Sequence, residues 1–282
     1  MINRSTDGKQ RVLSLSYGKD SLACLGAIEQ LGLPLDRIVH AEVWATDTIH
    51  ADLPPMVEFK AKADAIIKER WGFEVEHIRS QHSYEGYFYH QHTYNKTGKC
   101  SPILFPERNG IYGFPVRVGQ WCNSRLKVSA LSKAQKGASV VYIGIAVEET
   151  ARYHNLTGAK RSPLVEAEWT EADCRKWCEE NDLLSPIYST ASRGGCWFCH
   201  NQGVGQLRLL RKNYPELWQL LLKWDADSPV SFKADGHTVH DFDRRFQFED
   251  EGLIDPKARF RWSMLETSQA SRQKGNEKNV LF

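Results

Sequence analysis

Ser16-Tyr17-Gly18-Lys19-Asp20-Ser21 is the stretch of sequence that decides the fold. It follows an apolar run at 11–15 and precedes a helical pattern at 22–31. A strand, a tight turn and a helix in this order direct backbone N–H groups and the positive end of a helix at a phosphate. Gly18 allows close backbone approach, and Lys19 adds a positive charge. The stretch is not a Walker loop (G-x-x-x-x-G-K-S/T), because no second glycine stands in the required place before the lysine.

Strands and helices alternate along most of the chain. Strands are predicted at 11–16, 37–44, 73–78 and 139–145, and helices at 19–32, 55–70, 123–136 and 170–181. This alternation predicts an α/β fold, with a mainly parallel, Rossmann-like sheet flanked by helices. One further helix is predicted at 203–224, followed by a loop-rich end.

The same pattern predicts three parts. Residues 1–190 form the α/β domain, in which 79–120, rich in Tyr, His, Gly and Pro, is an active-site loop or an insertion. Residues 191–270 form a C-terminal region of helices and loops that contains a cysteine pair. Residues 271–282 are polar and are predicted to be a flexible tail.

Composition limits the class of protein. With 282 residues and 41% hydrophobic content, the chain can bury one large core, or one core plus a small appendage. A formal net charge of +2 does not indicate a dedicated nucleic-acid binder. No apolar run approaches the roughly 20 residues that span a bilayer, so no membrane partner is expected. The N-terminus does not resemble a signal peptide, and a cytoplasmic location is expected.

Polar residues follow the ends of two further predicted strands, where ligands bind in such sheets. Asp47 and Thr48 follow the second strand, and Asp47 suits a ribose hydroxyl or Mg²⁺. The segment from Gly144 through Glu149 to Arg152 follows the strand at 139–145, and Arg152 suits a phosphate. Taken alone these residues are weak signals, because an Asp at a strand end is usually a turn former and an Arg in the first turn of a helix is usually solvated.

The chain has seven cysteines, an odd number that suits metal binding or redox chemistry better than a disulfide framework. Cys196 and Cys199 form a C-x-x-C pair in a glycine turn, a spacing that lets two thiolates bind one metal or cluster. A redox dithiol or a purely structural knuckle remains open. Cys122 supplies a third thiol before a basic helix start. The remaining cysteines on predicted helices are expected in the core: Cys24, Cys174 and Cys178.

Four ordered motifs resemble the phosphoadenylyl-sulfate (PAPS) reductase family of the adenine nucleotide alpha-hydrolase (PP-loop ATP pyrophosphatase) superfamily. The first is S-Y-G-K-D-S at 16–21, similar to the family's S-G-G-K-D-S, and the second is I-G-x-x-x-E-E-x-x-R at 143–152. The others are W-C-N-S-R-L-K at 121–127, similar to the family's W-C-T-x-x-L-K, and G-C-x-x-C followed by L-R-x-x-Y-P-E-x-W at 195–218. The resemblance covers most of residues 11 to 222. Two departures stand out: Tyr17 replaces the first glycine of the loop, and Ala146 stands where many members carry an arginine.

The resemblance implies a HUP-type Rossmann-like fold that binds ATP and Mg²⁺. The residues that it assigns to nucleotide binding are Ser16, Tyr17, Gly18, Lys19, Asp20, Ser21, Asp47, Thr48, Gly144 and Glu149. Those that it assigns to catalysis are Lys19, Asp20, Asp47 and Arg152. It also implies a [4Fe-4S] cluster, with zinc as the alternative, held by Cys122, Cys196 and Cys199. Cys100 is the candidate fourth ligand, with His200 behind it.

One residue of the family's reductases is missing. They attack sulfate with a C-terminal cysteine, and this chain has no cysteine after Cys199. We therefore predict an enzyme that cleaves ATP to AMP and pyrophosphate, adenylates a nucleic acid (tRNA or DNA) or nucleobase, and couples this to sulfur transfer. Two alternatives remain: a PAPS or adenylyl-sulfate reductase that uses a thiol in trans, and a non-catalytic nucleotide-binding subunit. Expected partners are a sulfur donor or thioredoxin-like protein, and a second copy of the chain in a homodimer.

Overall fold

The computed structural model describes residues 2–91, 111–116, 121–189 and 194–265. The chain divides into two compact units, one formed by 1–88 and 120–198 and the other by 89–119 and 199–282. The domain boundary predicted near residue 190 stays a prediction, and the predicted tail at 271–282 lies outside the described residues. Within those residues, no helix has the length and apolar character needed to cross a membrane.

The first unit is built on a five-stranded sheet in the order β3-β2-β1-β4-β5. All neighbouring strands pair in parallel. The strands are β1 (Arg11–Leu15), β2 (Arg37–Glu42), β3 (Val75–Arg79), β4 (Val140–Tyr142) and β5 (Lys160–Arg161). The prediction of an α/β fold with a mainly parallel sheet is confirmed. Because strand order reverses at β1, the carboxyl end of β1 is the expected position of a ligand.

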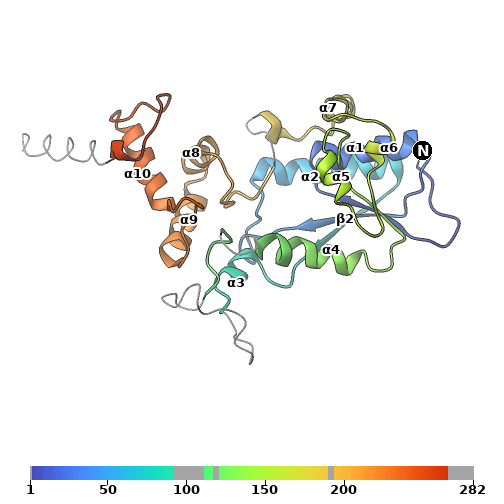
Figure 1. Ribbon diagram of the computed structural model, residues 1–282, viewed down its shortest axis with the longest axis horizontal. Helices are drawn as coiled ribbons and strands as arrows, with labels where there is room; N and C mark the ends of the chain where they lie inside the picture. The colour runs from blue at the N-terminus through green and yellow to red at the C-terminus, as the bar shows by residue number, and fades with distance from the viewer. Residues whose placement is uncertain (1, 92–110, 117–120, 190–193, 266–282) are drawn as a thin grey trace, which may run out of the picture. The chain divides into compact units, whose positions relative to one another are not determined.

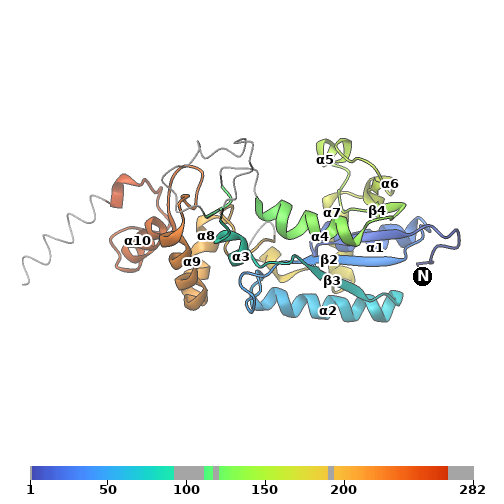
Figure 2. The same ribbon diagram turned by 90° about the horizontal axis from the view of Figure 1, so that it is seen from below.

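Helices cover both faces of this sheet. Figure 1 shows α1 (Lys19–Gln30) and α2 (Pro54–Trp71) on one side of the strands and α4 (Ser129–Ala134) on the other. In Figure 2, α2 runs alongside β2 and β3. The remaining elements of the unit are α3 (Tyr84–Phe88), the π-helix η2 (Asn123–Val128), α5 (Thr150–His154), α6 (Pro163–Glu166), α7 (Glu171–Glu180) and the 3₁₀-helix η3 (Pro186–Ser189).

Local sequence explains where these helices begin. Proline at the first turn of α2 needs no hydrogen-bond partner for an N–H, and Gly72 ends that helix with a left-handed φ of 70°. Thr170 begins α7 through a capping box with Asp173, as the sequence predicts.

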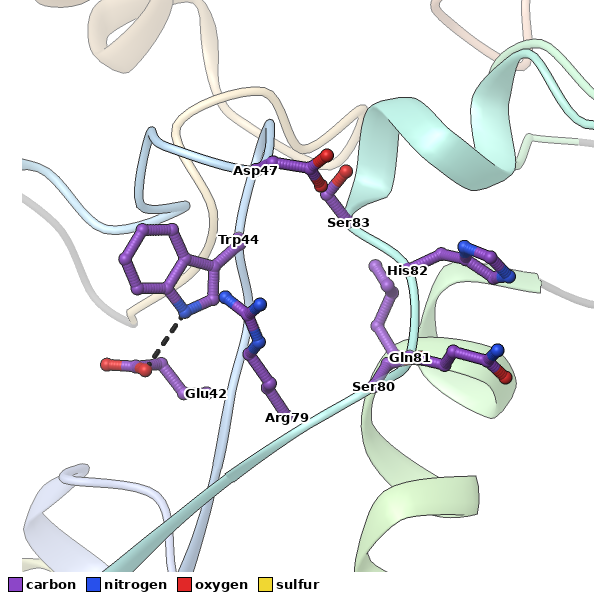
Figure 3. A pocket seen from close by; sticks show the side chains of 9 residues that line it. Glu42, Trp44, Asp47, Arg79, Ser80, Gln81, His82 and Ser83 are labelled. Atoms are coloured by element: carbon purple, nitrogen blue, oxygen red, sulfur yellow. Dashed lines mark hydrogen bonds between the residues drawn. The ribbon is translucent and has the colours of Figure 1, made fainter.

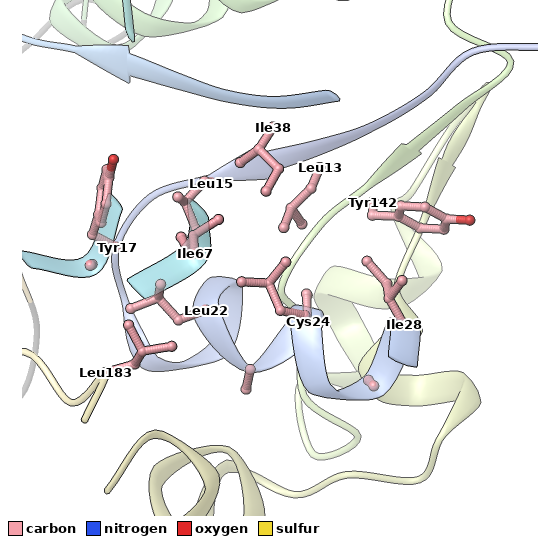
Figure 4. Packing of buried hydrophobic residues seen from close by; sticks show 14 of the residues in the cluster. Leu13, Leu15, Tyr17, Leu22, Cys24, Ile28, Ile38, Ile67, Tyr142 and Leu183 are labelled. Carbon is pink, nitrogen blue, oxygen red and sulfur yellow. The ribbon is translucent and has the colours of Figure 1, made fainter. Parts of the chain in front are cut away.

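The core of the first unit lies between β1 and the helices that cover it. Leu13 of β1 is aligned with Ile38 of β2 and Tyr142 of β4, and all three are buried. Figure 4 shows side chains of α1 and α2 packing on this row. Cys24, Cys174 and Cys178 are fully buried here, which confirms their placement in the core.

The described part of the second unit includes the helices α8 (Val204–Asn213), α9 (Pro215–Asp227) and α10 (Val239–Asp250). The prediction of one helix at 203–224 is wrong, because Pro215 has no N–H to continue the ladder and begins a second helix. The predicted loop-rich end is also wrong in part. Thr238 begins α10 through a capping box with Asp241, a signal that the sequence carried.

Candidate functional site

The loop at 16–21 joins the carboxyl end of β1 to the N-terminus of α1, with Gly18 as the N-cap residue. One hydroxyl fixes its shape. The Ser21 hydroxyl donates to the Gly18 carbonyl at 3.0 Å and accepts from the Ser16 backbone N–H at 3.1 Å. The turn is therefore organised before any ligand binds, and it leads directly into the N-terminus of α1, the end of a helix that suits an anion.

Tyr17 stands where the resemblance places a glycine, and its backbone keeps a glycine-like conformation with a φ of 56°. Its side chain is completely buried. The phenol donates to the carboxylate of Asp64 and lies 3.1 Å from Nε2 of His77. Burial, followed by this bond to Asp64, raises the pKa of Tyr17 well above its usual range. A buried hydrogen-bonded network thus offsets the cost of the left-handed conformation.

The ammonium of Lys19 is paired with two carboxylates of the protein. It lies 2.7 Å from the Asp20 carboxylate and 2.9 Å from that of Glu171 on α7. Burial alone would lower the pKa of Lys19, but the bonds to these two carboxylates outweigh it and raise the pKa. The backbone N–H of Lys19 donates to the Tyr188 hydroxyl at 3.0 Å. A phosphate that bound this N–H would replace the phenol oxygen.

A cavity of about 380 Å³ opens beside the loop. Its volume falls within the range of small-molecule sites, about 300–1,000 Å³. Residues of the first unit that line it come from the loop, the ends of β1 and β2, the helices α2 and η2, and the segments at 185–188 and 194–196. They include Ser16, Tyr17, Gly18, His40, Asp52, Lys60, Lys127, Tyr188 and Cys196. The predicted loop and one cysteine of the predicted pair therefore line the same cavity.

Gly144 brings the second predicted motif against the loop. A Cβ at this position would lie 2.5 Å from the Ser21 nitrogen and 2.6 Å from the Asp20 carbonyl carbon, so only glycine fits. The other two predicted residues of this segment bind each other, because the Arg152 guanidinium donates to the Glu149 carboxylate. Arg152 is largely exposed, with 60% of its side chain accessible.

The structure places Asp47 in a different, much smaller pocket at the end of β2. Figure 3 shows Asp47 near Ser83, with Arg79 and Trp44 on the same pocket wall. The indole of Trp44 donates to Glu42 at 2.9 Å. Thr48 takes part in a local turn, in which its N–H donates to the Thr46 hydroxyl at 3.3 Å. Asp47 and Thr48 do not line the larger cavity.

Aromatic contacts bring the two cysteine segments of the first unit together. Trp121, next to Cys122, stacks on Tyr84 at 5.1 Å, and Tyr84 packs against Phe198 at 4.1 Å. The segment after Cys196 is also fixed to the loop that follows β2, because the Trp197 indole donates to the His50 carbonyl at 2.9 Å. Cys122 and Cys196 thus belong to one packed aromatic region of this unit.

The predicted metal ligands suit iron–sulfur or zinc chemistry as a donor set, since thiolates bind both. Among the residues that the structure describes, no three His, Cys, Asp or Glu side chains are grouped closely enough to hold a metal ion. Cys199 belongs to the second unit, where the Lys233 ammonium donates to the carbonyls of His200 and Gln202 at 2.5 and 2.6 Å. Cys100 lies outside the described residues.

Three residues of the cavity were missed in the sequence: His40, Lys60 and Tyr188. His40 lies inside a strand and Tyr188 outside any motif, so no local pattern marks them. A weak signal existed for Lys60, which lies beside the apolar positions Phe59 and Ala63 of a predicted helix and so falls at the edge of its buried face.

No protein-family model matches the chain, and no curated protein matches it. Among solved structures, the chain is similar to the U34-tRNA thiolase NcsA from Methanococcus maripaludis with its [4Fe-4S] cluster, at 13% identity and a TM-score of 0.36. The similarity covers 87% of this chain and 73% of that one. A similarity of this size does not bear on what the present chain binds.

Proposed function

We propose that the chain is a divergent relative of the PAPS reductase family that binds ATP and Mg²⁺ and cleaves ATP between the α- and β-phosphates. One observation carries this proposal: the organised loop at 16–18 and Cys196 line the same cavity. The close packing of Gly144 on Asp20 and Ser21 supports it, because it joins two motifs that the resemblance assigns to nucleotide binding.

The proposed reaction is an adenylation followed by a substitution. An oxygen of the acceptor, a tRNA or DNA or a nucleobase, attacks the α-phosphorus of ATP, and pyrophosphate leaves with the electron pair of the broken P–O bond. A sulfur nucleophile then attacks the adenylated carbon or phosphorus of the acceptor, and AMP leaves. The sulfur comes from a donor that the chain itself does not supply.

The residues that the resemblance assigns to the site take distinct roles in this scheme. The N–H groups at the start of α1 bind the phosphates, and Lys19 neutralises charge on pyrophosphate as it exchanges its carboxylate partners for phosphate oxygens. Asp20 positions the ammonium of Lys19. Asp47 binds Mg²⁺ or ribose, and Arg152 binds the α-phosphate once it leaves Glu149.

The cysteines receive a separate role. Cys122, Cys196 and Cys199 would hold a [4Fe-4S] cluster or zinc, with Cys100 as the fourth ligand. A cluster would carry sulfide or electrons to the adenylated acceptor, whereas zinc would be structural.

Pyrophosphate release tests the proposal. We expect wild-type protein to release pyrophosphate from ATP in the presence of Mg²⁺ and an acceptor, with tRNA and DNA tested separately. A Gly18→Val variant, which obstructs the loop, is expected to lose this activity. Sulfite release from PAPS with thioredoxin, without pyrophosphate release from ATP, would instead show the reductase reaction. ATP binding without any cleavage would show a nucleotide-binding subunit.

A further inference from the structure

Lys60 is a buried lysine whose ammonium is held at two points. It lies on α2 and is 7% exposed. Its Nζ donates to a carboxylate oxygen of Asp52 at 2.5 Å and lies 2.9 Å from Nε2 of His40. A lysine is seldom buried without a reason, because removing its charge from water costs free energy unless partners replace the water.

The hydrogen bonds of His40 show where the proton lies. Nδ1 of His40 is 2.9 Å from the carbonyl oxygen of Leu15, which only accepts, so Nδ1 carries the hydrogen. Nε2 is then the acceptor for Lys60. Burial, and after it the charge of Lys60, lowers the pKa of His40 to about 2. His40 is therefore neutral, and Lys60 is the charged partner.

One donor of Lys60 is left for a ligand. An ammonium has three N–H donors, and His40 and Asp52 accept from two of them. Within the described residues no third acceptor contacts Nζ, whose other contact is with the face of the Tyr17 ring at 5.3 Å. The side chain lines the 380 Å³ cavity together with the loop.

The charges around the cavity favour an anion. Among its described lining residues the formal charges are those of Lys60, Lys127 and Asp52. Asp52 is bound to Lys60, so the lining carries a net positive charge, and the N-terminal end of α1 adds to it. In contrast, Lys19 is held by two carboxylates.

We propose that Lys60, positioned by His40 and Asp52, is a phosphate-binding residue of this cavity, with Lys127 as the second cation. The inference rests on the proposed function and deepens it, because it makes the cavity selective for ligands with several phosphate charges, such as a nucleoside triphosphate or pyrophosphate. The ammonium of Lys60 is already held in position when the ligand binds, whereas that of Lys19 must first leave Asp20 and Glu171.

The test compares Lys60→Met with Lys62→Met by isothermal titration with ATP and with inorganic pyrophosphate. Lys62 lies on the same helix, is exposed and is paired only with Asp182 at 3.7 Å. We expect Lys60→Met to weaken binding of both ligands at least about tenfold, because a charge-assisted hydrogen bond is lost, and Lys62→Met to leave binding unchanged. Equal binding by Lys60→Met and wild type would overturn the inference and leave the proposed function standing.

A second variant distinguishes a specific loss of ligand binding from a loss caused by misfolding. Asp52→Asn keeps an oxygen acceptor for Lys60 and removes the negative charge beside it. We expect pyrophosphate to bind about two- to tenfold more tightly, a gain that misfolding cannot produce and that Lys60→Met in the same chain should abolish. Unchanged or weaker binding by Asp52→Asn overturns the inference, including where Lys60→Met does not fold.

The wild-type titrations separate the two proposals. If the wild-type protein binds pyrophosphate through Lys60 but does not bind ATP, the proposed function is contradicted and the inference is supported. A wild-type protein that binds neither ligand would overturn both.

Discussion

Tyr17 shows how one residue can take a conformation made for glycine. A φ of 56° is unfavourable for a tyrosine by about 1 kcal/mol, yet the ring is fully buried and its hydroxyl is bound by Asp64 and His77. Side-chain burial therefore outweighs backbone strain at this position. The loop keeps the same turn that a glycine would give, and gains a connection to β3 through His77.

Tyr17→Gly should consequently destabilise the protein, although it restores the residue that the resemblance predicts. Loss of a buried aromatic ring costs ~3 kcal/mol or more, which exceeds the relieved strain. Tyr17→Phe keeps the ring and loses only the hydroxyl, so we expect a smaller loss of about 1–2 kcal/mol. Urea unfolding of both variants gives the comparison. A Tyr17→Gly protein as stable as wild type would show that the buried network contributes nothing net.

At the scale of elements, the contact between the segment that follows β4 and the start of α1 depends on Gly144. Gly144→Ala would place a Cβ 2.5–2.7 Å from backbone atoms of Asp20 and Ser21, which no rotamer change can relieve. We expect a loss of about 1–3 kcal/mol in the free energy of unfolding, with weaker pyrophosphate binding as the start of α1 shifts. Gly205→Ala in α8 is the matched control, since its Cβ meets no atom within 4 Å. If Gly144→Ala is as stable as Gly205→Ala, the close contact of Gly144 with the start of α1 is contradicted.

The packing of α8 on α10 depends on one carboxylate. Glu249 accepts from Arg208 at 2.7 Å and from Arg245 at 2.8 Å, and its side chain is 4% exposed. Burial alone would raise the pKa of Glu249, but the bonds to Arg208 and then Arg245 lower it below the usual 4.5. A carboxylate whose pKa is lower in the folded state than in the unfolded state stabilises the fold. This stabilisation is fully present above the unfolded-state pKa and is lost as the pH falls through the folded-state pKa.

Glu249→Gln should therefore destabilise the second unit by ~3 kcal/mol at about pH 7, because the buried guanidinium of Arg245 and the partly exposed one of Arg208 lose their counter-charge. The difference from wild type should shrink as pH falls below 4.5, where wild-type Glu249 also becomes protonated. Hydrogen exchange of α10 amides across this pH range measures both effects. Glu179→Gln, which removes an exposed pair with Arg175, should cost less than ~0.5 kcal/mol. A difference at Glu249 that persisted at low pH would contradict this account.

These elements also show how far sequence reasoning reaches. Four of the five parallel strands and the helix start at Thr170 were predicted, because apolar periodicity and capping are local; the two-residue strand β5 is too short to show a pattern. The helix break at Pro215 and the capped start of α10 were equally local and were overlooked. The loop at 16–21 was predicted, but the burial of Lys60 depends on His40 and Asp52, which only the tertiary fold brings to it. The same holds for Glu171, one of the two carboxylates bound to Lys19.

At the scale of the whole molecule, the six described cysteines fall into two groups. Cys24, Cys174 and Cys178 are fully buried, and burial raises the pKa of all three thiols, to about 12 for Cys178. A thiol that stays protonated is a poor metal ligand. Cys122, Cys196 and Cys199 are partly exposed; the first precedes η2, and the other two belong to one C-x-x-C turn. This second group coincides with the described members of the ligand set that the resemblance implies.

Anaerobically purified protein should therefore contain iron and acid-labile sulfide, or zinc, and Cys122→Ala should lose most of it. Cys178→Ala is the matched control: it shortens a core side chain, so it should reduce stability by about 1–2 kcal/mol and leave the metal content unchanged. Metal analysis with a visible absorption spectrum measures the outcome, and iron with sulfide distinguishes a cluster from structural zinc. Metal that persisted in Cys122→Ala, or was lost equally in both variants, would mean that the exposed thiols are not ligands. The cavity lined by Cys196 would then serve nucleotide chemistry without sulfur transfer.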